Sequence, residues 1–453
     1  MNRLLFLKFK YLILGVLSTS VVLNVYNGYL RPKKIFVVSL PERLGPGLVR
    51  HGRVFGRIDR TTTRWPAFDL KAVREDMLER RRRIKLTCEA RNHSKEEPQP
   101  RAIVSIQREV LYCPVEKTAS TFFRQLLYQL DNTNPLRSPF EVPVKLVYEC
   151  PTALVYLKYL KQHRERFHKN HTLKTVMKQY TKLMFVRDPW SRLFSVYVDK
   201  LYSPNPFYWG FWGIKAIKKF RVDATQKALT CGNDVTFSEF LKFVLHLRSI
   251  DKNMDVHLNP MAELCKPCSV DYDVIGYTST FNRDLMFLLS TLNLTNAQIN
   301  FESFADDVVK QAVEDAVLNP FRDWTNKITA CMTKLEAAKR IWRKLQIRSF
   351  ISSEINFPAN ITEEIIQNMD AYDFIDILFE ASRRSKSDVN LKHQKDNALT
   401  DAFKAVDMSI VEAIRNIYEF DFSLFGFESR PNSFFRDESG DLDVFNIAKP
   451  WKV

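Results

Sequence analysis

Two short segments combine cations with hydroxyl groups in an order that suits the binding of phosphate. The first reads Cys113-Pro-Val-Glu-Lys-Thr-Ala-Ser-Thr-Phe-Phe-Arg124, in which a cation precedes small and hydroxyl-bearing residues: Lys117, Thr118, Ala119, Ser120 and Thr121. The pattern predicts a strand over residues 110–115 and a helix over residues 121–130, with this loop between them. The free N–H groups and positive dipole end at the start of a helix stabilise an anion, and Lys117 adds charge.

Two other interpretations of this segment lead to different functions. Hydroxyl groups such as those of Thr118 and Ser120 also cap helices without binding any ligand. An ATP-binding P-loop requires the pattern G-x-x-x-x-G-K-[ST], and Glu116 stands where its final glycine should be. We therefore expect an anion-binding loop that is not a Mg-ATP site, with helix capping as the alternative.

The second segment, Arg187-Asp-Pro-Trp-Ser-Arg-Leu-Phe-Ser195, follows a predicted strand over residues 182–186. Its proline suits the first position of a helix, and Ser195 lies nearly two turns further on. A planar guanidinium at the strand end and a hydroxyl on the helix are able to bind a second phosphate. The alternative is an ion pair between Arg187 and Asp188 beside a capped helix.

A third segment contains a histidine and two cysteines, and runs from Asp255 to Gly276. Cys265-Lys-Pro-Cys268 invites a zinc or redox interpretation, but zinc needs about two further ligands and only His257 is near in the sequence. A redox dithiol needs a different context, with the thiol at a helix start after the first strand. We expect structural disulfides instead, with pairings that the sequence leaves open.

The first two segments resemble the nucleotide-binding motifs of sulfotransferases that use 3′-phosphoadenosine 5′-phosphosulfate (PAPS). The resemblance implies that Lys117 and the loop of residues 118–121, with Arg124, bind the 5′-phosphosulfate. It also implies that Arg187 and Ser195 bind the 3′-phosphate. The implied fold is a P-loop-like parallel sheet flanked by helices.

Two further blocks narrow the resemblance to the Golgi carbohydrate sulfotransferases that include the chondroitin and dermatan 4-O-sulfotransferases. Residues 255–276 are similar to "H-W-x-P…L-C-x-P-C…Y-D-x-[IV]-G-K", and residues 417–427 to the closing "Y-x-x-D-F-x-L-F-G-Y". The chain departs from these patterns at Leu258, Tyr277 and Ser279, outside the two phosphate-binding segments.

Sulfuryl transfer decides which residues are candidates for catalysis. An acceptor hydroxyl attacks sulfur while the bridging oxygen leaves with negative charge, so the protein must position both reactants and supply cations. Lys117 is the candidate for stabilising the leaving oxygen. His257 is the candidate general base because the pKa of histidine lies near the working pH, and Glu149 is the alternative. The mechanism demands no metal.

The charge balance indicates an anionic partner without identifying it. The chain has 68 Lys and Arg against 52 Asp and Glu, a net charge of +16, while 45% hydrophobic residues exclude wholesale disorder. A PAPS-dependent enzyme with an anionic glycan acceptor fits this balance. One alternative is a catalytically silent glycan-binding relative. The other is a membrane-anchored adaptor or nucleic-acid binder that acts through the basic region before residue 100. The N-glycosylation sequons and the cysteines of the chain, described below, oppose this second alternative. We expect no nucleic-acid partner.

An apolar stretch between basic flanks predicts a membrane anchor, and a single domain of catalytic size is expected behind it. We expect a cytoplasmic tail over residues 1–10, a transmembrane signal anchor over 11–30, a basic stem over 31–100, a sulfotransferase domain over 101–430 and a C-terminal tail over 431–453. A signal peptide cleaved near residues 18–20 is the rival interpretation. Within the stem, residues 69–86 are predicted to form a solvated helix, and the arginines at 80–83 are either its charged face or a processing site.

Alternating strand and helix patterns from residue 101 onward predict an α/β fold with a parallel sheet and a mainly helical C-terminal part. The sequence also suits an oxidising lumen. Seven cysteines and four N-glycosylation sequons, beginning at Asn92, Asn170, Asn293 and Asn360, all follow the predicted anchor. We therefore expect a single-pass type II protein of the Golgi membrane, with its catalytic domain in the lumen.

Overall fold

A five-stranded sheet underlies the part of the chain that the computed structural model describes, which comprises residues 69–91, 100–132, 138–149, 154–157, 172–250, 254–294 and 303–435. The strand order is β3-β1-β2-β4-β5. The strands are β1 (Ile103–Ser105), β2 (Val110–Cys113), β3 (Val155–Tyr156), β4 (Thr181–Val186) and β5 (Val274–Tyr277). Strands β2, β4 and β5 are parallel, whereas β1 is antiparallel to both of its neighbours.

The predicted α/β class is confirmed, but the expectation of an all-parallel sheet is wrong at one edge. Strands β1 and β2 are separated by residues 106–109 alone, where Glu109 has a φ of 51°. A connection this short joins only antiparallel strands, because a parallel pair requires a crossover of a dozen or more residues. The parallel part of the sheet is therefore limited to the three strands that carry the predicted site segments at their ends.

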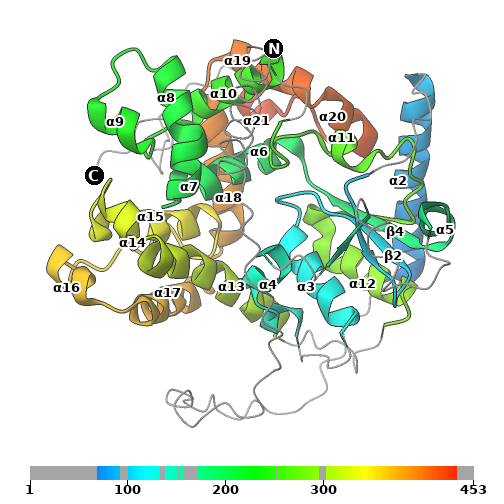
Figure 1. Ribbon diagram of the computed structural model, residues 1–453, viewed down its shortest axis with the longest axis horizontal. Helices are drawn as coiled ribbons and strands as arrows, with labels where there is room; N and C mark the ends of the chain where they lie inside the picture. Colours follow the sequence, from blue (N-terminus) through cyan, green and yellow to red (C-terminus); the bar gives the residue numbers. More distant parts are fainter. Residues whose placement is uncertain are drawn as a thin grey trace, which may run out of the picture. The chain divides into compact units, whose positions relative to one another are not determined.

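Helices cover both faces of the sheet, as predicted (Figure 1). Side chains along each strand alternate between two hydrophobic clusters, so that Tyr112 and Phe185 belong to one and Leu111 and Met184 to the other. The first cluster includes α3 (Ser120–Leu130), α4 (Val144–Glu149) and α12 (Phe281–Thr291). The second includes α5 (Leu173–Gln179), α11 (Met261–Cys265) and α20 (Glu419–Phe425).

Helix α2 (Leu70–Ala90) lies along the β5 edge of the sheet and contributes to both clusters. Its Arg80 is only 8% exposed, donates to the carbonyl of Ile275 on β5 at 2.8 Å and pairs with buried Asp284 at 2.6 Å. An edge strand with free carbonyls invites pairing with other chains, and α2 covers it. The prediction of a helix is confirmed, but its interpretation as a solvated part of the stem is wrong, because one face is buried against the sheet.

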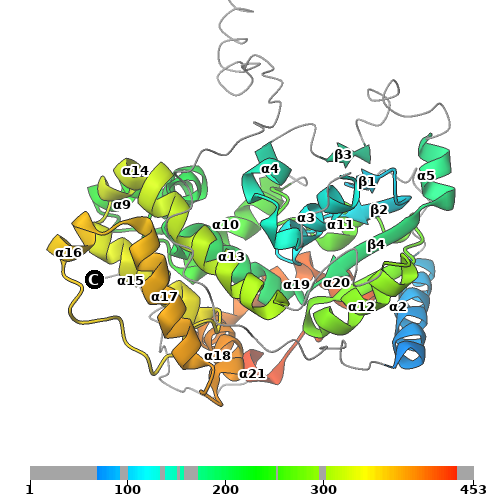
Figure 2. The same cartoon turned by 90° about the horizontal axis from the view of Figure 1, so that it is seen from below.

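The remaining helices form two groups beside the sheet (Figure 2). One group packs around a large cluster rich in Trp, Tyr and Phe; it contains α6 (Pro189–Tyr197), η3 (Val198–Tyr202), α7 (Pro206–Tyr208), η4 (Trp209–Gly213), α8 (Ile214–Phe220), α9 (Gln226–Cys231), α10 (Phe237–Ile250), α18 (Leu391–Lys404), α19 (Met408–Ile417) and α21 (Asn432–Phe435). The other packs around a second cluster and contains α13 (Phe304–Leu318), η6 (Asn319–Asp323), α16 (Glu363–Asn368) and α17 (Ala371–Ser385). Helix α15 (Lys334–Ile347) contributes to both clusters, and α14 (Thr325–Thr329) contributes to the first through Ile328. Short 3-10 turns η1 (Pro139–Glu141) and η5 (Thr278–Thr280) complete the described elements.

Three disulfides tie distant segments together and confirm the structural interpretation of the cysteines. They join Cys88 to Cys268, Cys113 to Cys265 and Cys231 to Cys331. The two cysteines of the Cys265-Lys-Pro-Cys268 segment thus bond to different partners, one at the end of β2 and one on α2, and not to each other. The seventh cysteine, Cys150, lies outside the described residues.

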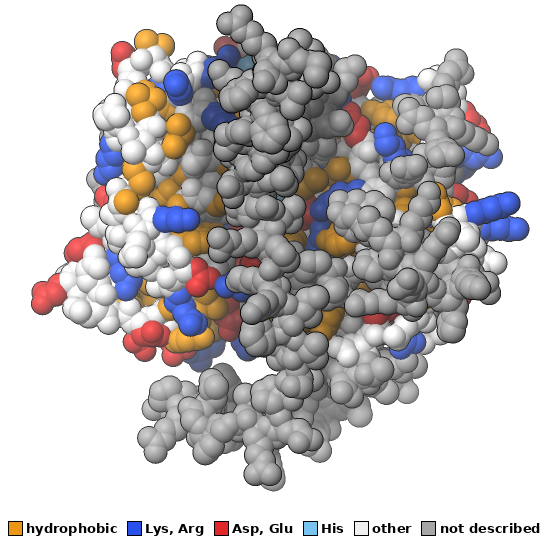
Figure 3. Space-filling view, in the orientation of Figure 1, with side chains coloured by type: hydrophobic (Ala, Val, Ile, Leu, Met, Phe, Trp, Pro, Cys, Tyr) orange, Lys and Arg blue, Asp and Glu red, His pale blue; other side chains and the backbone are white. Residues whose placement is uncertain are grey.

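The predicted anchor over residues 11–30 also lies outside the described residues. Among the helices that the structure does describe, none has both the length and the apolar character that crossing a bilayer requires. On the described surface in Figure 3, basic and acidic side chains are interspersed and do not separate into fields of one sign.

Candidate active site

The loop between β2 and α3 has the backbone of an anion-binding loop. Lys117 and Ala119 have φ values of 72° and 64°, in the left-handed region that residues other than glycine seldom adopt. Such strained backbone clusters at ligand-binding positions, and a loop that enters a helix in this way presents backbone N–H groups to an anion. Ala119 is the N-cap of α3 and supplies no side-chain cap, so the helix N–H groups are not covered from that position.

Buried Glu116 organises the side chains under this loop. It accepts hydrogen bonds from Arg124 at 3.0 Å, Arg101 at 3.1 Å and Ser120 at 2.6 Å. Burial alone would raise the pKa of Glu116, but Arg124 and Arg101 outweigh it and lower the pKa to about 2. Glu116 is therefore an anion with three partners, which explains why glutamate stands where a Walker loop has glycine.

Not all of the predicted donor-binding side chains face the cavity above the loop. Thr118 is fully buried and donates to the carbonyl of Val115, and Arg124 is 1% exposed between Glu116 and Tyr156. Neither side chain lines the cavity, so their predicted contacts with the sulfate donor gain no support from the structure. Ser120 and Thr121 do line the cavity, although Ser120 already donates to Glu116. Lys117 and Ala119 line it as well.

A cavity of about 770 Å³ joins the predicted segments at the carboxyl ends of β2, β4 and β5. Ligands of α/β proteins bind at this edge of the sheet. The cavity is lined by residues from the first segment, the second segment and the histidine block: Lys117, Ala119, Ser120, Thr121, Arg187, Ser191, Ser195 and His257. Ser279, where the chain departs from the family pattern, also lines it, so this departure lies within the site and not apart from it.

Arg187 directly follows β4 and lines the cavity. Its guanidinium donates to the carbonyl of Lys117 at 3.2 Å, which links the second segment to the first. The neighbouring Asp188 carboxylate accepts from the N–H of Ser191 at 2.8 Å and caps α6, as the alternative interpretation expects, and its charge opposes the fall in the pKa of Arg187. Burial lowers the pKa of Arg187 to about 10.

Four further cations line the cavity from the helical C-terminal half, and sequence analysis missed all of them: Lys344, Arg348, Lys392 and Lys395. Repulsion from Arg187, followed by burial, lowers the pKa of Lys395 to about 8. Cations that repel one another around one cavity are typical of an anion site, because a bound anion removes the repulsion. The signal in the sequence is faint, since it consists only of basic pairs at helical spacing.

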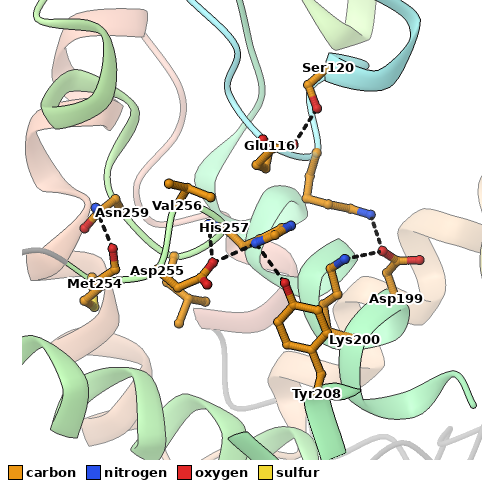
Figure 4. Close-up of polar contacts among 12 residues, drawn as sticks. Glu116, Ser120, Asp199, Lys200, Tyr208, Met254, Asp255, Val256, His257 and Asn259 are labelled. Carbon is orange, nitrogen blue, oxygen red and sulfur yellow. Dashed lines mark hydrogen bonds and ion pairs between the residues drawn. The ribbon is translucent and has the colours of Figure 1, made fainter. Parts of the chain in front are cut away.

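Asp199 is the carboxylate around which the lysines gather. It lies 3.0 Å from the ammonium groups of both Lys117 and Lys344. The Lys200 ammonium lies 3.5 Å from it (Figure 4). Burial opposes ionisation of Asp199, but these lysines hold its pKa well below the ordinary value. Burial lowers the pKa of Lys117 to about 8, and Asp199 limits the fall.

His257 is held in an orientation that leaves one ring nitrogen available. Its Nδ1 lies 2.7 Å from the Asp255 carboxylate and 3.5 Å from the Tyr208 hydroxyl (Figure 4). Hydrogen bonding to His257 keeps the pKa of Asp255 low despite burial, so this carboxylate only accepts and Nδ1 carries the proton. Nε2 is then the basic nitrogen. Burial lowers the pKa of His257, while Asp255 opposes the shift. Glu149, the alternative base, lines a neighbouring cavity and not this one.

Comparison with known proteins now connects this geometry to a family. The model of the sulfotransferase family matches residues 100–345, more than half of the chain. The chain belongs to the sulfotransferase family. The matched range contains every predicted site residue, whereas Arg348, Lys392 and Lys395 lie beyond it.

Curated relatives of this sulfotransferase are carbohydrate sulfotransferases. The chain is 31% identical to human carbohydrate sulfotransferase 9 over 206 residues, which are 46% of this chain and 44% of the relative. It is 30% identical to mouse carbohydrate sulfotransferase 11 over 206 residues, 45% of this chain and 55% of the relative. The chain thus spans about half the length of the curated relatives that it matches. No solved structure matches it significantly.

Two motifs of the sulfotransferase fix His257 relative to Lys117. Buried Arg192 donates to the carbonyls of Glu116 at 3.0 Å, Asn259 at 2.8 Å and Val256 at 3.1 Å, which joins the loop between β2 and α3 to the histidine block. From the closing motif, Tyr418 donates to the carbonyl of Leu258 at 2.6 Å. In the same motif, the Asp421 carboxylate accepts from the first two N–H groups of α11. The closing motif therefore acts as a support for the site from more than 150 residues away.

Proposed function

We propose that this protein transfers a sulfuryl group from PAPS to a hydroxyl group of a glycan. The observation that carries the proposal is that a single cavity brings together Lys117, Arg187 and His257, the residues expected for the leaving oxygen, the 3′-phosphate and the base. Membership of the sulfotransferase family supports the reaction class. The names of the matched relatives support a carbohydrate acceptor over a silent glycan-binding protein.

The residues of the cavity fit a donor that carries a 5′-phosphosulfate and a 3′-phosphate. Lys117, the hydroxyl of Thr121 and the backbone at the start of α3 suit a phosphosulfate, because they combine an ammonium group with N–H and O–H donors. Arg187 and Ser195 suit a 3′-phosphate, and Arg348 and Lys395 add charge on the same side. A phosphate bound among them would relieve the repulsion that depresses the pKa of Lys395.

The chemistry of transfer then assigns two roles. The acceptor oxygen forms a bond to sulfur as the bond between sulfur and the bridging oxygen breaks, and Lys117 stabilises the negative charge that develops on that oxygen. Nε2 of His257 takes the proton of the acceptor hydroxyl, and Asp255 stabilises the imidazolium that results. Asp255 is therefore a positioning residue and not a catalytic one. No step requires a metal.

We further propose that the acceptor is an anionic, chondroitin-like glycan and that the protein is a single-pass type II protein of the Golgi membrane. The cations around the cavity support an anionic acceptor. Three disulfides support an oxidising compartment, and exposed Asn360 supports glycosylation there. The anchor over residues 11–30 remains a prediction from the sequence, as does the part of the stem that precedes α2.

Binding of 3′-phosphoadenosine 5′-phosphate (PAP) and of AMP to the full chain, measured by calorimetry, tests the donor site. The two ligands differ only in the 3′-phosphate. We expect the wild type to bind PAP more tightly than AMP by tenfold or more, and Arg187→Met to lose most of that preference. Equal affinities of the wild type for PAP and AMP would contradict the assignment of the 3′-phosphate site.

A further inference from the structure

Two phenylalanine rings lie exposed on the surface beside the candidate active site. Phe207 on α7 is 54% exposed and Phe211 on η4 is 45% exposed. Their ring centroids are 5.9 Å apart and the rings are inclined by only 28°, so they form one stacked pair. Exposed aromatic side chains that lie together forgo the free energy of burial, and such patches mark binding surfaces.

The backbone that carries this pair is fixed by its buried neighbours. Trp209 and Trp212 are 1% and 2% exposed, and the indole N–H of Trp209 donates to the carbonyl of Leu201 at 2.9 Å. Gly213 contacts the chain at Gly232 so closely that a Cβ atom would lie 2.1 Å from the Gly232 carbonyl oxygen. Two residues of the segment are thus anchored in the core, and the two phenylalanines are held outward on a rigid support.

The Tyr208 ring connects the exposed pair to His257, the proposed general base. The Phe207 and Tyr208 ring centroids are 5.1 Å apart, and those of Tyr208 and His257 are 5.8 Å apart. The Lys200 ammonium lies 4.6 Å from the centroid of the Tyr208 ring. Figure 4 shows Tyr208 pointing toward His257, with Lys200 alongside. A molecule whose hydroxyl reaches His257 can therefore extend over the phenylalanine pair.

Positive charge also borders the apolar pair at Phe211. The Lys215 ammonium lies 5.0 Å from the centroid of the Phe211 ring, and Lys218 and Lys219 are exposed on the same helix, α8. The surface thus offers flat apolar rings next to ammonium groups. A pyranose ring with an apolar C–H face and an acidic substituent is complementary to it, since the rings bury the C–H face and the ammonium pairs with the acid.

We infer that Phe207, Phe211 and Lys215 form an acceptor-binding surface that takes an acidic sugar neighbouring the sugar that is sulfated. This inference rests on the proposed function. The inference extends the proposed function by assigning the residues that contact the glycan beyond the reacting hydroxyl group. The surface lies within the range that matches the sulfotransferase family.

Calorimetry with the full chain and an unsulfated chondroitin hexasaccharide tests the inference without requiring turnover. We expect the double variant Phe207→Ala/Phe211→Ala to weaken binding of the hexasaccharide about tenfold, and Lys215→Gln to weaken it about threefold at low salt. PAP affinity should not change in either variant. The matched control is Tyr372→Ala, which removes an aromatic ring that is 55% exposed on α17, and it should leave hexasaccharide binding unchanged.

A second ligand separates the contributions of ring and charge. With a hexasaccharide whose carboxylates have been reduced to alcohols, Lys215→Gln should no longer differ from the wild type, whereas the double phenylalanine variant still should. The inference is overturned if the wild type fails to bind either hexasaccharide, or if the double variant binds as the wild type does. Failure of the proposed function has a different signature, which is a wild type that does not bind PAP.

Discussion

The depressed pKa of Lys117 predicts a basic limit to donor use that a single substitution should remove. The pKa is about 8, because burial outweighs the attraction of Asp199. If the ammonium form holds the phosphosulfate, about nine-tenths of the free enzyme is competent at pH 7 and about one-tenth at pH 9. The value of kcat/KM for PAPS should therefore fall about tenfold between these pH values, with a midpoint near 8.

The perturbation is Lys117→Arg, which keeps the positive charge but moves its deprotonation above the assay range. Initial rates at subsaturating PAPS, measured from pH 6 to 10 with the full chain, report the free enzyme. We expect the variant to transfer more slowly, because its planar group cannot reproduce a point charge at the leaving oxygen, but to show no decline near pH 8. At saturating PAPS the wild-type limit should move to higher pH, because the bound anion stabilises the ammonium group.

Lys395 provides the necessary control, because its pKa is also about 8. Lys395→Arg should lower the affinity for PAPS only slightly and leave the midpoint of the fall in kcat/KM near pH 8. If the fall near pH 8 persists in Lys117→Arg and disappears in Lys395→Arg, the assignment of Lys117 is refuted. If Lys117→Arg has no measurable turnover, the pH dependence of PAP binding carries the same information, with the same two outcomes.

Four other substitutions test the remaining roles. Lys117→Ala should abolish transfer while the unfolding midpoint in urea stays near that of the wild type, and undiminished turnover would remove the leaving-group role. His257→Ala should slow single turnovers by about 100-fold or more with little effect on PAP affinity, and a normal rate would indicate another base. The base in the wild type must be neutral, and burial lowers the pKa of His257 below the ordinary value, so the acidic limit of activity should lie below pH 6.5. Asp255→Asn removes a contact that raises this pKa, so the acidic limit should move to still lower pH. A limit that moves to higher pH would contradict the proposed pair of His257 and Asp255. Arg192→Met leaves two buried carbonyls and one partly buried carbonyl without this donor and should cost about 3 kcal/mol in unfolding free energy, which an unchanged urea midpoint would disprove.

The elements that hold the two segments proposed to bind phosphate were predictable because each has a strong local pattern. The strands predicted over residues 110–115 and 182–186 are β2 (Val110–Cys113) and β4 (Thr181–Val186). The helix predicted over 121–130 is α3 (Ser120–Leu130). Parallel strands then bring their following loops to one edge of the sheet, so the sequence was sufficient to place Lys117 near Arg187.

Side-chain direction within the donor loop was not predictable from the sequence. Thr118 and Arg124 have the right residue types for a phosphate site, yet both are buried beneath the loop. The reason for Arg124 is Glu116, whose buried charge requires partners and holds the Arg124 guanidinium away from the cavity. A glutamate that replaces a glycine indicates that the loop differs from a Walker loop, but not where its carboxylate points.

The contribution of the C-terminal half was also beyond sequence reasoning. Lys344 on α15 and Lys395 on α18 meet Asp199, which lies on η3 in the N-terminal half, only through tertiary packing, and none of the three belongs to a recognisable motif. The burial of Arg80 has a similar cause, since its partner Asp284 is 204 residues away in the sequence. Long-range ion pairs of this kind leave no periodic trace in a single sequence.

Sulfate transfer from radiolabelled PAPS by the full chain, with a panel of glycans as acceptors, tests the central claim most directly. The panel should include unsulfated chondroitin, dermatan and neutral N-glycans, with Lys117→Ala as the inactive control. We predict label on at least one acidic glycan with the wild type and none with the variant. Label on no glycan, from a preparation that also fails to bind PAP, would contradict the claim that this protein is a PAPS-dependent carbohydrate sulfotransferase.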